Sequence, residues 1–507
     1  MKTEKENKNR RWWAFLLVLI VVGALLGMFY LPRTAVAGEE LRRVNILSDV
    51  QQRDEEGNIV AEVKADAAEG HVEQRVDSAA IRVKQEAYVD AVPKGMTAIE
   101  DFAPSGARRE MDKFYASLGQ SRNRPVRVAY FGDSYIEGDI LTMDLRALLQ
   151  QKFGGKGVGF VEIACVSSDF RRSATTRRNG WTRYHANERG RGFKAALQSP
   201  AGSYFIPSGT ATYELRGQTS VYGNLLGSAD VATVFFTPGT GLNIACSLNG
   251  GENQSLFSNG AAQAPDTYEE TIEVLDSDST VHYKTVTRTV EAAQQGAGNV
   301  VAKSVSGDIS RFNMTVTGGH SSRFYGVALD GHTGVAVDNF SLRGSGGQHL
   351  SGIPAETLRS FASVRPYDLI ILHYGLNVAN EKQKDYGGYT GQLGKVIDQM
   401  KVAFPQASIL VVSMGDRDKR GSDGQLHTMG GVKEMVSYER KMASDHHVAF
   451  WNLYEAMGGD GSLAKMTEQK QANLDYTHIN FAGGRHLAEL LFNVLMNGKE
   501  NYDKRTQ

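Results

Sequence analysis

A serine in a tight turn is the first residue of this sequence whose type and position could support catalysis. Ser134 stands in the run Gly132-Asp133-Ser134, directly after the apolar segment Val126–Phe131. That segment is typical of a buried strand. Side chains at the carboxyl end of a parallel strand lie in the crevice where open α/β sheets bind ligands. We therefore interpret Ser134 as a candidate nucleophile, with an ordinary β-turn as the alternative.

A nucleophilic serine needs a base, and the sequence offers one near its carboxyl end. Asp475 precedes His478 by three residues, just before a helical pattern. An aspartate at this spacing can accept the Nδ1 proton of the histidine and leave Nε2 to take a serine proton. A solvated surface loop is the alternative. Other histidines are weaker candidates, because His373 lies inside an apolar strand and His446 and His447 lie at a helix end.

Two further segments could donate hydrogen bonds to a carbonyl oxygen that gains negative charge. Asn377 follows the apolar segment Leu369–His373, and its side-chain amide is a donor. The segment Asn339–Gly347 is rich in glycine, and the backbone amide of Gly344 within it can approach a ligand closely. Together with the backbone amide of Ser134, these groups make a candidate oxyanion hole. Ordinary turns and a flexible loop are the alternatives.

Three more residues are candidates for contact with a substrate: Asp133, Arg343 and Trp451. Surface charge and core packing are the simpler interpretations of the last two. No cofactor or metal is expected, because the acidic residues and histidine between 416 and 427 lack the spacing of a metal site. The chain has 56 basic and 57 acidic residues, a balance that excludes a basic nucleic-acid binder.

These candidates need an α/β frame to position them. Apolar strand patterns alternate with helical patterns at both ends of the exported chain, which predicts a parallel sheet with helices on both faces. The expected strands are Val126–Phe131, Leu369–His373, Ser408–Ser413 and Val448–Leu453, and the expected helices are Met111–Leu118, Thr142–Phe153, Gly391–Phe404, Val432–Ser444 and Asn480–Met496. From about 170 to 330, short β-branched runs separated by turn residues predict an antiparallel β-sandwich insert.

The amino terminus predicts a membrane segment. Residues 12–30 are 19 uncharged, mostly apolar residues that follow a basic stretch. As a helix they would span about 28 Å, close to the thickness of a bilayer core. The basic flank places the tip in the cytoplasm and exports the rest to the periplasm. Ala35-Val36-Ala37 before Gly38 also fits a cleavage site, so a signal peptide removed after Ala37 is the alternative.

The predicted organisation has five parts. They are the tip and anchor or signal peptide at 1–37, a linker or stalk at 38–109, the first part of the α/β domain at 110–169, the β insert at 170–330 and the second part of the α/β domain at 331–507. Two cysteines, Cys165 and Cys246, could form one bridge, which the sequence leaves undecided.

Four short blocks of this sequence resemble those of the GDSL/SGNH hydrolase superfamily. The blocks are Gly132-Asp133-Ser134, the Gly344 loop, Gly375-x-Asn377 and Asp475-x-x-His478. Tyr135 stands where the superfamily pattern has leucine. The resemblance implies a flavodoxin-like sheet and esterase or acetyl hydrolase activity. The interrupting β insert and the predicted export make the chain similar to the bacterial peptidoglycan O-acetylesterases with a carbohydrate-binding-module-like domain.

The resemblance also implies roles for the candidate residues. Ser134 would be the nucleophile, His478 the general base and acid, and Asp475 the carboxylate that orients the histidine. The backbone amides of Ser134 and Gly344 and the Asn377 side chain would form the oxyanion hole.

We therefore expect a serine esterase of the cell envelope that removes O-acetyl groups from a polysaccharide, peptidoglycan foremost. Its partners would be the O-acetylated polysaccharide and the inner membrane, the latter through residues 12–30, with no nucleic acid. Two alternatives stay open. One is an O-acetyltransferase that uses the same acyl-enzyme, and the other is a non-catalytic glycan-binding envelope protein.

Overall fold

The computed structural model describes residues 83, 85–164, 170–259, 299–319 and 321–507 in full, except for the side chains of 189–191. It also describes the backbone of strands at 35–36, 39–40, 267–275 and 281–289. The predicted membrane segment at 12–30 and Cys165 lie outside the described residues. Within the described residues, no helix combines the length and the apolar character that crossing a membrane requires. Residues 74–507 form one unit, which contains all the candidate site residues.

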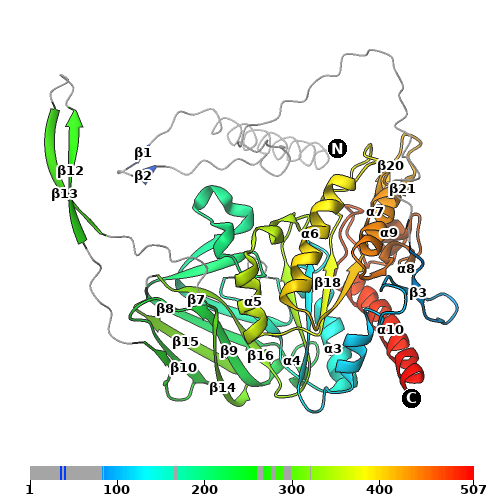
Figure 1. The fold of residues 1–507 in the computed structure, drawn as a ribbon, viewed down its shortest axis with the longest axis horizontal. Helices are drawn as coiled ribbons and strands as arrows, with labels where there is room; N and C mark the ends of the chain where they lie inside the picture. The colour runs from blue at the N-terminus through cyan, green and yellow to red at the C-terminus, as the bar shows by residue number, and fades with distance from the viewer. Residues whose placement is uncertain are drawn as a thin grey trace, which may run out of the picture. The chain divides into compact units, whose positions relative to one another are not determined.

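A seven-stranded mixed sheet forms the frame of this unit (Figure 1). Its strands in spatial order are β17 (Gly334–Ser341), β5 (Pro125–Gly132), β18 (Leu369–His373), β19 (Ser408–Val412), β22 (Ala449–Trp451), β4 (Ile99–Asp101) and β3 (Tyr88–Val89). The first five are parallel, and β4 and β3 continue the sheet antiparallel. Every residue of β18 and β19 is buried, as continuous apolar strands covered on both faces should be.

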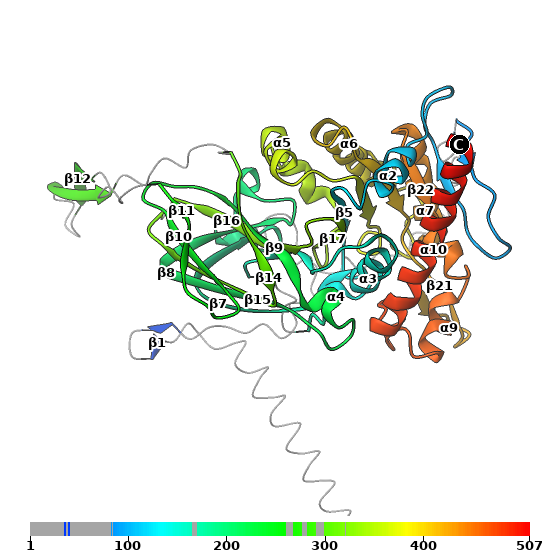
Figure 2. The ribbon, with the colours of Figure 1, turned by 90° about the horizontal axis from the view of Figure 1, so that it is seen from below.

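Helices pack on the sheet in two groups. The neighbours α5, α6 and α7 form one group, and α2, α3 and α10 form the other. Their bounds are α2 (Asp112–Leu118), α3 (Thr142–Phe153), α5 (Ala355–Val364), α6 (Gly387–Ala403), α7 (Val432–Asp445) and α10 (Phe481–Thr506), with short helices α8 (Leu453–Ala456) and α9 (Ser462–Glu468) before α10. Figure 2 shows β5 and β17 between α5 and α6 on one side and α3 on the other. The predicted α/β frame is present, and the predicted strands and helices lie within a few residues of their expected bounds, except that α10 ends at Thr506 and not at Met496.

An antiparallel β domain interrupts this frame. Nine of its strands are hydrogen-bonded into one sheet. A run of five strands from β11 to β7 and a run of four from β6 to β14 meet at a single residue pair, Phe324 and Phe205. These strands are β6 (Gly159–Glu162), β7 (Ala174–His185), β8 (Ser203–Gly217), β9 (Ala229–Thr237), β10 (Asn243–Leu248), β11 (Gln254–Ser258), β14 (Val301–Ile309), β15 (Arg311–Thr317) and β16 (Arg323–Asp330). Two more, β12 (Thr267–Leu275) and β13 (Val281–Thr289), pair with each other. The domain has its own apolar core, in which Cys246 is buried.

The β domain begins earlier than the predicted boundary at 170. Strand β6 pairs with β16 and therefore belongs to the β domain, although it lies in the segment 110–169 assigned to the α/β domain. Four residues are too few to show a periodic pattern, so this strand could not be recognised from the sequence. Phe160 on β6 also contacts Phe340 on β17, with ring centroids 5.5 Å apart, and its backbone amide donates to Asp338 Oδ1 at 2.8 Å. The two domains are thus joined by packing and hydrogen bonds.

The predicted stalk at 38–109 is wrong for its last part. Strands β3 and β4 extend the α/β sheet beyond β22, and Asp101 at the end of β4 accepts hydrogen bonds from the backbone amides of Glu110 and Met111. Asp101 thereby fixes the start of α2 to the sheet edge. Strands of two and three residues are too short to show an alternation of apolar and polar side chains, so the sequence pattern predicts a linker here.

Candidate active site

The end of β5 holds Ser134 in a tight turn. The Asp133 side chain accepts the backbone amide of Tyr135 at 3.0 Å, and the Asp133 carbonyl accepts that of Ile136 at 3.3 Å. These bonds close the turn on both sides of the serine. The Ser134 side chain is only 7% exposed, yet its hydroxyl has no hydrogen-bond partner among the described residues. A buried hydroxyl left unpaired is costly and uncommon, and functional sites are where such groups occur.

The loop before α10 holds the predicted aspartate and histidine together. His478 Nδ1 lies 2.7 Å from Asp475 Oδ2, and Asp475 Oδ1 accepts the backbone amides of Thr477 and His478, both at 3.0 Å. Burial alone would raise the pKa of Asp475, but the hydrogen bonds from His478 and Thr477 outweigh it and hold that pKa below its ordinary value. The charged carboxylate therefore fixes the imidazole with Nδ1 toward Asp475, and no described residue hydrogen-bonds Nε2.

One packing contact and two charge interactions place the serine turn near the histidine loop. Helix α10 approaches the segment after Ser134 so closely that a Cβ at Gly484 would lie 1.9 Å from the Ile140 carbonyl oxygen. The charges of the two parts also interact. Burial raises the pKa of Glu137, and the charges of Arg343 and His478 reduce that rise. Asp475 in turn adds to the rise that burial causes in the pKa of Tyr135. Ser134 and His478 therefore lie on facing segments at the carboxyl edge of the sheet.

The Asn377 amide connects the serine turn to the glycine-rich loop. Its Nδ2 donates to Asp133 Oδ2 and to the Ser345 carbonyl oxygen, both at 3.1 Å. Gly344, next to Ser345, has φ of +77°, and nothing lies within 4 Å of the position that a Cβ would take. The structure thus brings Asn377 and the Gly344 loop to the same edge as Ser134. Both hydrogens of the Asn377 amide are engaged, so one must be shared or redirected before this side chain can hold an oxyanion.

Asn339 and Ser341 lie on β17 and not in the loop where they were expected. The Asn339 side chain donates to the Ile136 carbonyl at 2.6 Å and to the Thr142 hydroxyl at 2.7 Å. It therefore supports the segment that follows Ser134, and only residues from 342 onward form the glycine-rich loop.

Two of the three candidates for substrate contact are buried and form hydrogen bonds inside the protein. Asp133 is buried, and both of its carboxylate oxygens are used inside the protein, by Tyr135 and Asn377. Burial raises the pKa of Asp133 to about 7, against the lowering effect of these hydrogen bonds. Trp451 is 2% exposed on β22, and its indole donates to the Thr97 carbonyl at 3.1 Å. Its position beside β4 makes it a core residue.

Arg343, the third, is at the surface next to Gly344. Its side chain is 71% exposed, and its Nη1 lies 3.8 Å from Glu137 Oε2. The backbone carbonyl of Arg343 accepts a hydrogen bond of 2.6 Å from the side chain of Asn187, which comes from the β domain. The β domain thus contributes to the edge of the site.

Sequence reasoning missed Glu137, which is buried three residues after Ser134 and faces both Arg343 and His478. The one signal in the sequence was an acidic residue three positions after the candidate serine. The contribution of Asn187 had no sequence signal, because it depends on how the β domain folds back on the frame.

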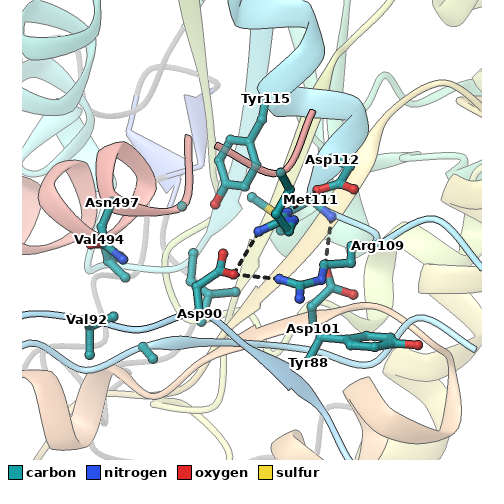
Figure 3. A pocket seen from close by; sticks show the side chains of 14 residues that line it. Tyr88, Asp90, Val92, Asp101, Arg109, Met111, Asp112, Tyr115, Val494 and Asn497 are labelled. Atoms are coloured by element: carbon teal, nitrogen blue, oxygen red, sulfur yellow. Dashed lines mark hydrogen bonds and ion pairs between the residues drawn. The ribbon is translucent and has the colours of Figure 1, made fainter. Parts of the chain in front are cut away.

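A hollow at a different place in the molecule lies between β3, β4, the start of α2 and the end of α10 (Figure 3). Its charges are paired with one another. Asp90 Oδ1 lies 2.6 Å from Arg109 and 2.8 Å from Arg505, and Arg505 also pairs with Asp112 at 2.8 Å. None of the predicted site residues lines it. We call this group of charges the terminal clasp, because it connects the first strands to the last helix.

Comparisons with known proteins bear on the fold. No protein-family model and no curated protein matches the sequence. Among solved structures, a peptidoglycan O-acetylesterase matches with 19% identity and a TM-score of 0.58, over 80% of this chain and 99% of its own. Two family 2 carbohydrate esterases match more weakly. The one from Myceliophthora fergusii is 11% identical with a TM-score of 0.25, over 62% of this chain and 98% of its own. The one from Clostridium thermocellum is 11% identical with a TM-score of 0.24, over 60% and 97%.

TM-scores this low do not show that the two carbohydrate esterases share the fold of this chain. The first match spans nearly the whole of the other chain, including both an α/β frame and a β domain here. It confirms the fold that the four sequence blocks implied. The chain has the fold of a solved peptidoglycan O-acetylesterase.

Proposed function

We propose that this protein is a serine esterase that removes O-acetyl groups from a polysaccharide through a Ser134–His478–Asp475 mechanism. One observation carries the proposal. A serine hydroxyl with no hydrogen-bond partner among the described residues stands at the carboxyl end of β5, on a segment that faces a histidine held by an aspartate. This arrangement has the parts that nucleophilic catalysis on an ester needs.

In the first half of the reaction, Ser134 Oγ attacks the acetyl carbonyl carbon while His478 Nε2 takes the hydroxyl proton. The carbonyl oxygen becomes negative and is held by the backbone amides of Ser134 and Gly344 and by the Asn377 amide. The intermediate then collapses to an acetyl-serine. The sugar oxygen leaves with the proton that His478 returns, so the products of this half are the acyl-enzyme and the free sugar hydroxyl.

In the second half, water replaces the sugar. His478 takes a proton from water, the hydroxide attacks the acetyl-serine carbonyl, and the same donors hold the oxyanion. Collapse breaks the bond to Ser134 Oγ, which recovers its proton from His478, and acetate leaves. Asp475 keeps its negative charge throughout and stabilises the imidazolium that forms in both halves.

The likeness in fold to a peptidoglycan O-acetylesterase supports peptidoglycan as the polysaccharide. The amino-terminal sequence supports a place in the cell envelope, since the basic tip and apolar residues 12–30 suit a membrane anchor or an export signal. We propose the inner membrane as the attachment site, with the catalytic part in the periplasm.

The test measures acetate release by the full-length protein from p-nitrophenyl acetate and from O-acetylated peptidoglycan. We expect Ser134→Ala to lower kcat by on the order of 10⁶. Ser363→Ala, at an exposed position near the end of α5, is the matched control and should keep full activity. Adding a glycan acceptor should leave the acetate yield unchanged, and acetylated acceptor in its place would indicate transfer. Unchanged activity of Ser134→Ala would disprove the mechanism.

A further inference from the structure

Three side chains that the mechanism does not use lie at the surface around the facing segments of Ser134 and His478. Phe170 is 42% exposed, and its ring lies so close to Gly138 that a Cβ there would be 2.2 Å from Cε2. The Arg172 guanidinium lies 4.0 Å from the ring centroid of Phe481, three residues after His478. Arg343 is the exposed arginine beside Gly344. We call these three residues the rim.

The part of the rim at 170–173 is held in place by alternate residues. Arg171 and Ser173 are buried and both bind the buried carboxylate of Asp139, with Arg171 Nη2 at 2.8 Å from Asp139 Oδ2. Phe170 and Arg172, which alternate with these two buried residues, are both exposed. The anchor is Asp139, in the short helical turn Glu137–Asp139 that follows the serine turn.

Arg343 is fixed from the other domain. Its carbonyl accepts the Asn187 side chain at 2.6 Å, which holds the loop while leaving the guanidinium in solvent. Its one acidic neighbour among the described residues is Glu137, at 3.8 Å, which is long for a charge-assisted hydrogen bond. Arg343 can therefore bind another carboxylate without giving up a strong pair.

The charges of the rim are not balanced. Arg172 forms no ion pair with a described residue, and Arg343 shares only Glu137. Guanidinium groups bind carboxylates through paired hydrogen bonds, and an exposed aromatic face packs against apolar or flat surfaces such as sugar rings. Two exposed arginines beside an aromatic ring thus suit a sugar that carries a nearby carboxylate better than a neutral sugar.

We propose that Phe170, Arg172 and Arg343 form a subsite for a carboxylate-bearing part of the acetylated glycan, so that the enzyme prefers anionic over neutral acetylated glycans. This inference rests on the proposed esterase function. It narrows the substrate to glycans such as peptidoglycan, whose stem peptides carry carboxylates, and disfavours neutral ones such as xylan.

The experiment compares kcat/KM of the full-length protein on three substrates: O-acetylated muropeptides, acetylated xylan and p-nitrophenyl acetate. We expect Arg343→Gln and Arg172→Gln each to lower kcat/KM on muropeptides about tenfold, through KM. Activity on acetylated xylan and p-nitrophenyl acetate should stay within twofold of the unmodified protein. Phe170→Ala should raise KM for both glycans and leave the small ester unaffected.

Arg122→Gln is the matched control. Arg122 is an exposed arginine at the amino-terminal side of β5, whose eight residues separate it by roughly 26 Å from the Ser134 end of the strand. It should leave all three activities unchanged. Added NaCl should reduce the preference of the unmodified protein for muropeptides, because salt screens exposed charges.

Two results would overturn the inference. One is an equal loss on xylan and muropeptides in the arginine variants, and the other is no loss on muropeptides. Both presuppose activity on p-nitrophenyl acetate in the unmodified protein. Absence of that activity would instead contradict the proposed esterase function, so the two failures can be told apart.

Discussion

Two buried aspartates flank Ser134 on the same stretch of chain, and their surroundings give them opposite charge behaviour. Asp139 contacts the buried Arg146 at 3.0 Å and Arg171 at 2.8 Å. Burial would raise the pKa of Asp139, but these two arginines hold it well below its ordinary value. Asp133 has no ion pair with a described residue, and burial raises its pKa to about 7.

The difference separates a structural anchor from a tunable orienting group. Asp139 is held in its charged form and joins three parts of the chain, namely its own segment, α3 through Arg146 and the segment before β7 through Arg171. Asp133 accepts from Asn377 and so controls the direction of an amide that the reaction needs. A carboxylate that can lose its charge near neutral pH can change that direction, whereas one locked between two arginines cannot.

The largest effect is expected from Asp139→Asn. This change leaves Arg146 and Arg171 buried without a counter-charge, and breaking a buried ion pair in this way costs about 3–5 kcal/mol of unfolding free energy. Chemical denaturation, followed by fluorescence, measures the loss. The double variant Asp139→Asn with Arg171→Met should recover part of it, because one buried charge fewer is left unpaired. Full stability of Asp139→Asn would show that the anchor interpretation is wrong.

The next effect concerns the rate. We expect Asn377→Ala to lower kcat on p-nitrophenyl acetate by about 10²–10³, which is typical for the loss of one oxyanion donor. Asp133→Asn should reproduce much of this loss, because an amide at 133 cannot accept from both Tyr135 and Asn377. In contrast to Asp139→Asn, the main change should be in kcat. Full kcat in Asp133→Asn would remove the orienting role from Asp133.

Local patterns in the sequence were sufficient for the frame and for the triad candidates. Ser134 at a strand end and Asp475 three residues before His478 are close in sequence to the elements that place them. For Trp451 the sequence left substrate contact and core packing open, because its burial depends on β4, a three-residue strand far away in the sequence. A strand this short leaves no periodic pattern that would have decided between them.

Arg343 was a candidate from the sequence, but the other two rim residues and the charges of the two aspartates could not be predicted, for a related reason. The opposite charge behaviour of Asp133 and Asp139 depends on which side chains the fold brings to each of them. Arg171 reaches Asp139 from the segment before β7, and Asn187 reaches Arg343 from the segment after β7, so both contacts depend on how the β domain folds. Contacts between residues far apart in the chain produce no characteristic residue spacing, so a single sequence does not reveal them.

The pH dependence of stability tests the state of Asp133. Its pKa in the folded protein, about 7, lies above its ordinary value, so the folded protein holds this proton more tightly than the unfolded chain. The stabilisation is complete below the ordinary pKa and is lost as pH rises toward 7. Tm of the unmodified protein minus that of Asp133→Asn should therefore fall by a few degrees from pH 5 to 7 and then level off. A constant difference would mean that Asp133 does not titrate in this range.

The smallest effect is expected at the terminal clasp, which provides a contrast to both aspartates. Asp90 also pairs with two arginines, Arg109 and Arg505, but its side chain is 22% exposed whereas that of Asp139 is fully buried. Partly exposed ion pairs contribute about 0.2–1 kcal/mol because water solvates the charges and salt screens them. Asp90→Asn should therefore lower the unfolding free energy by about 1 kcal/mol or less, measured by the same denaturation, and should leave kcat unchanged. A loss as large as that of Asp139→Asn would show that burial is not what distinguishes the two clusters.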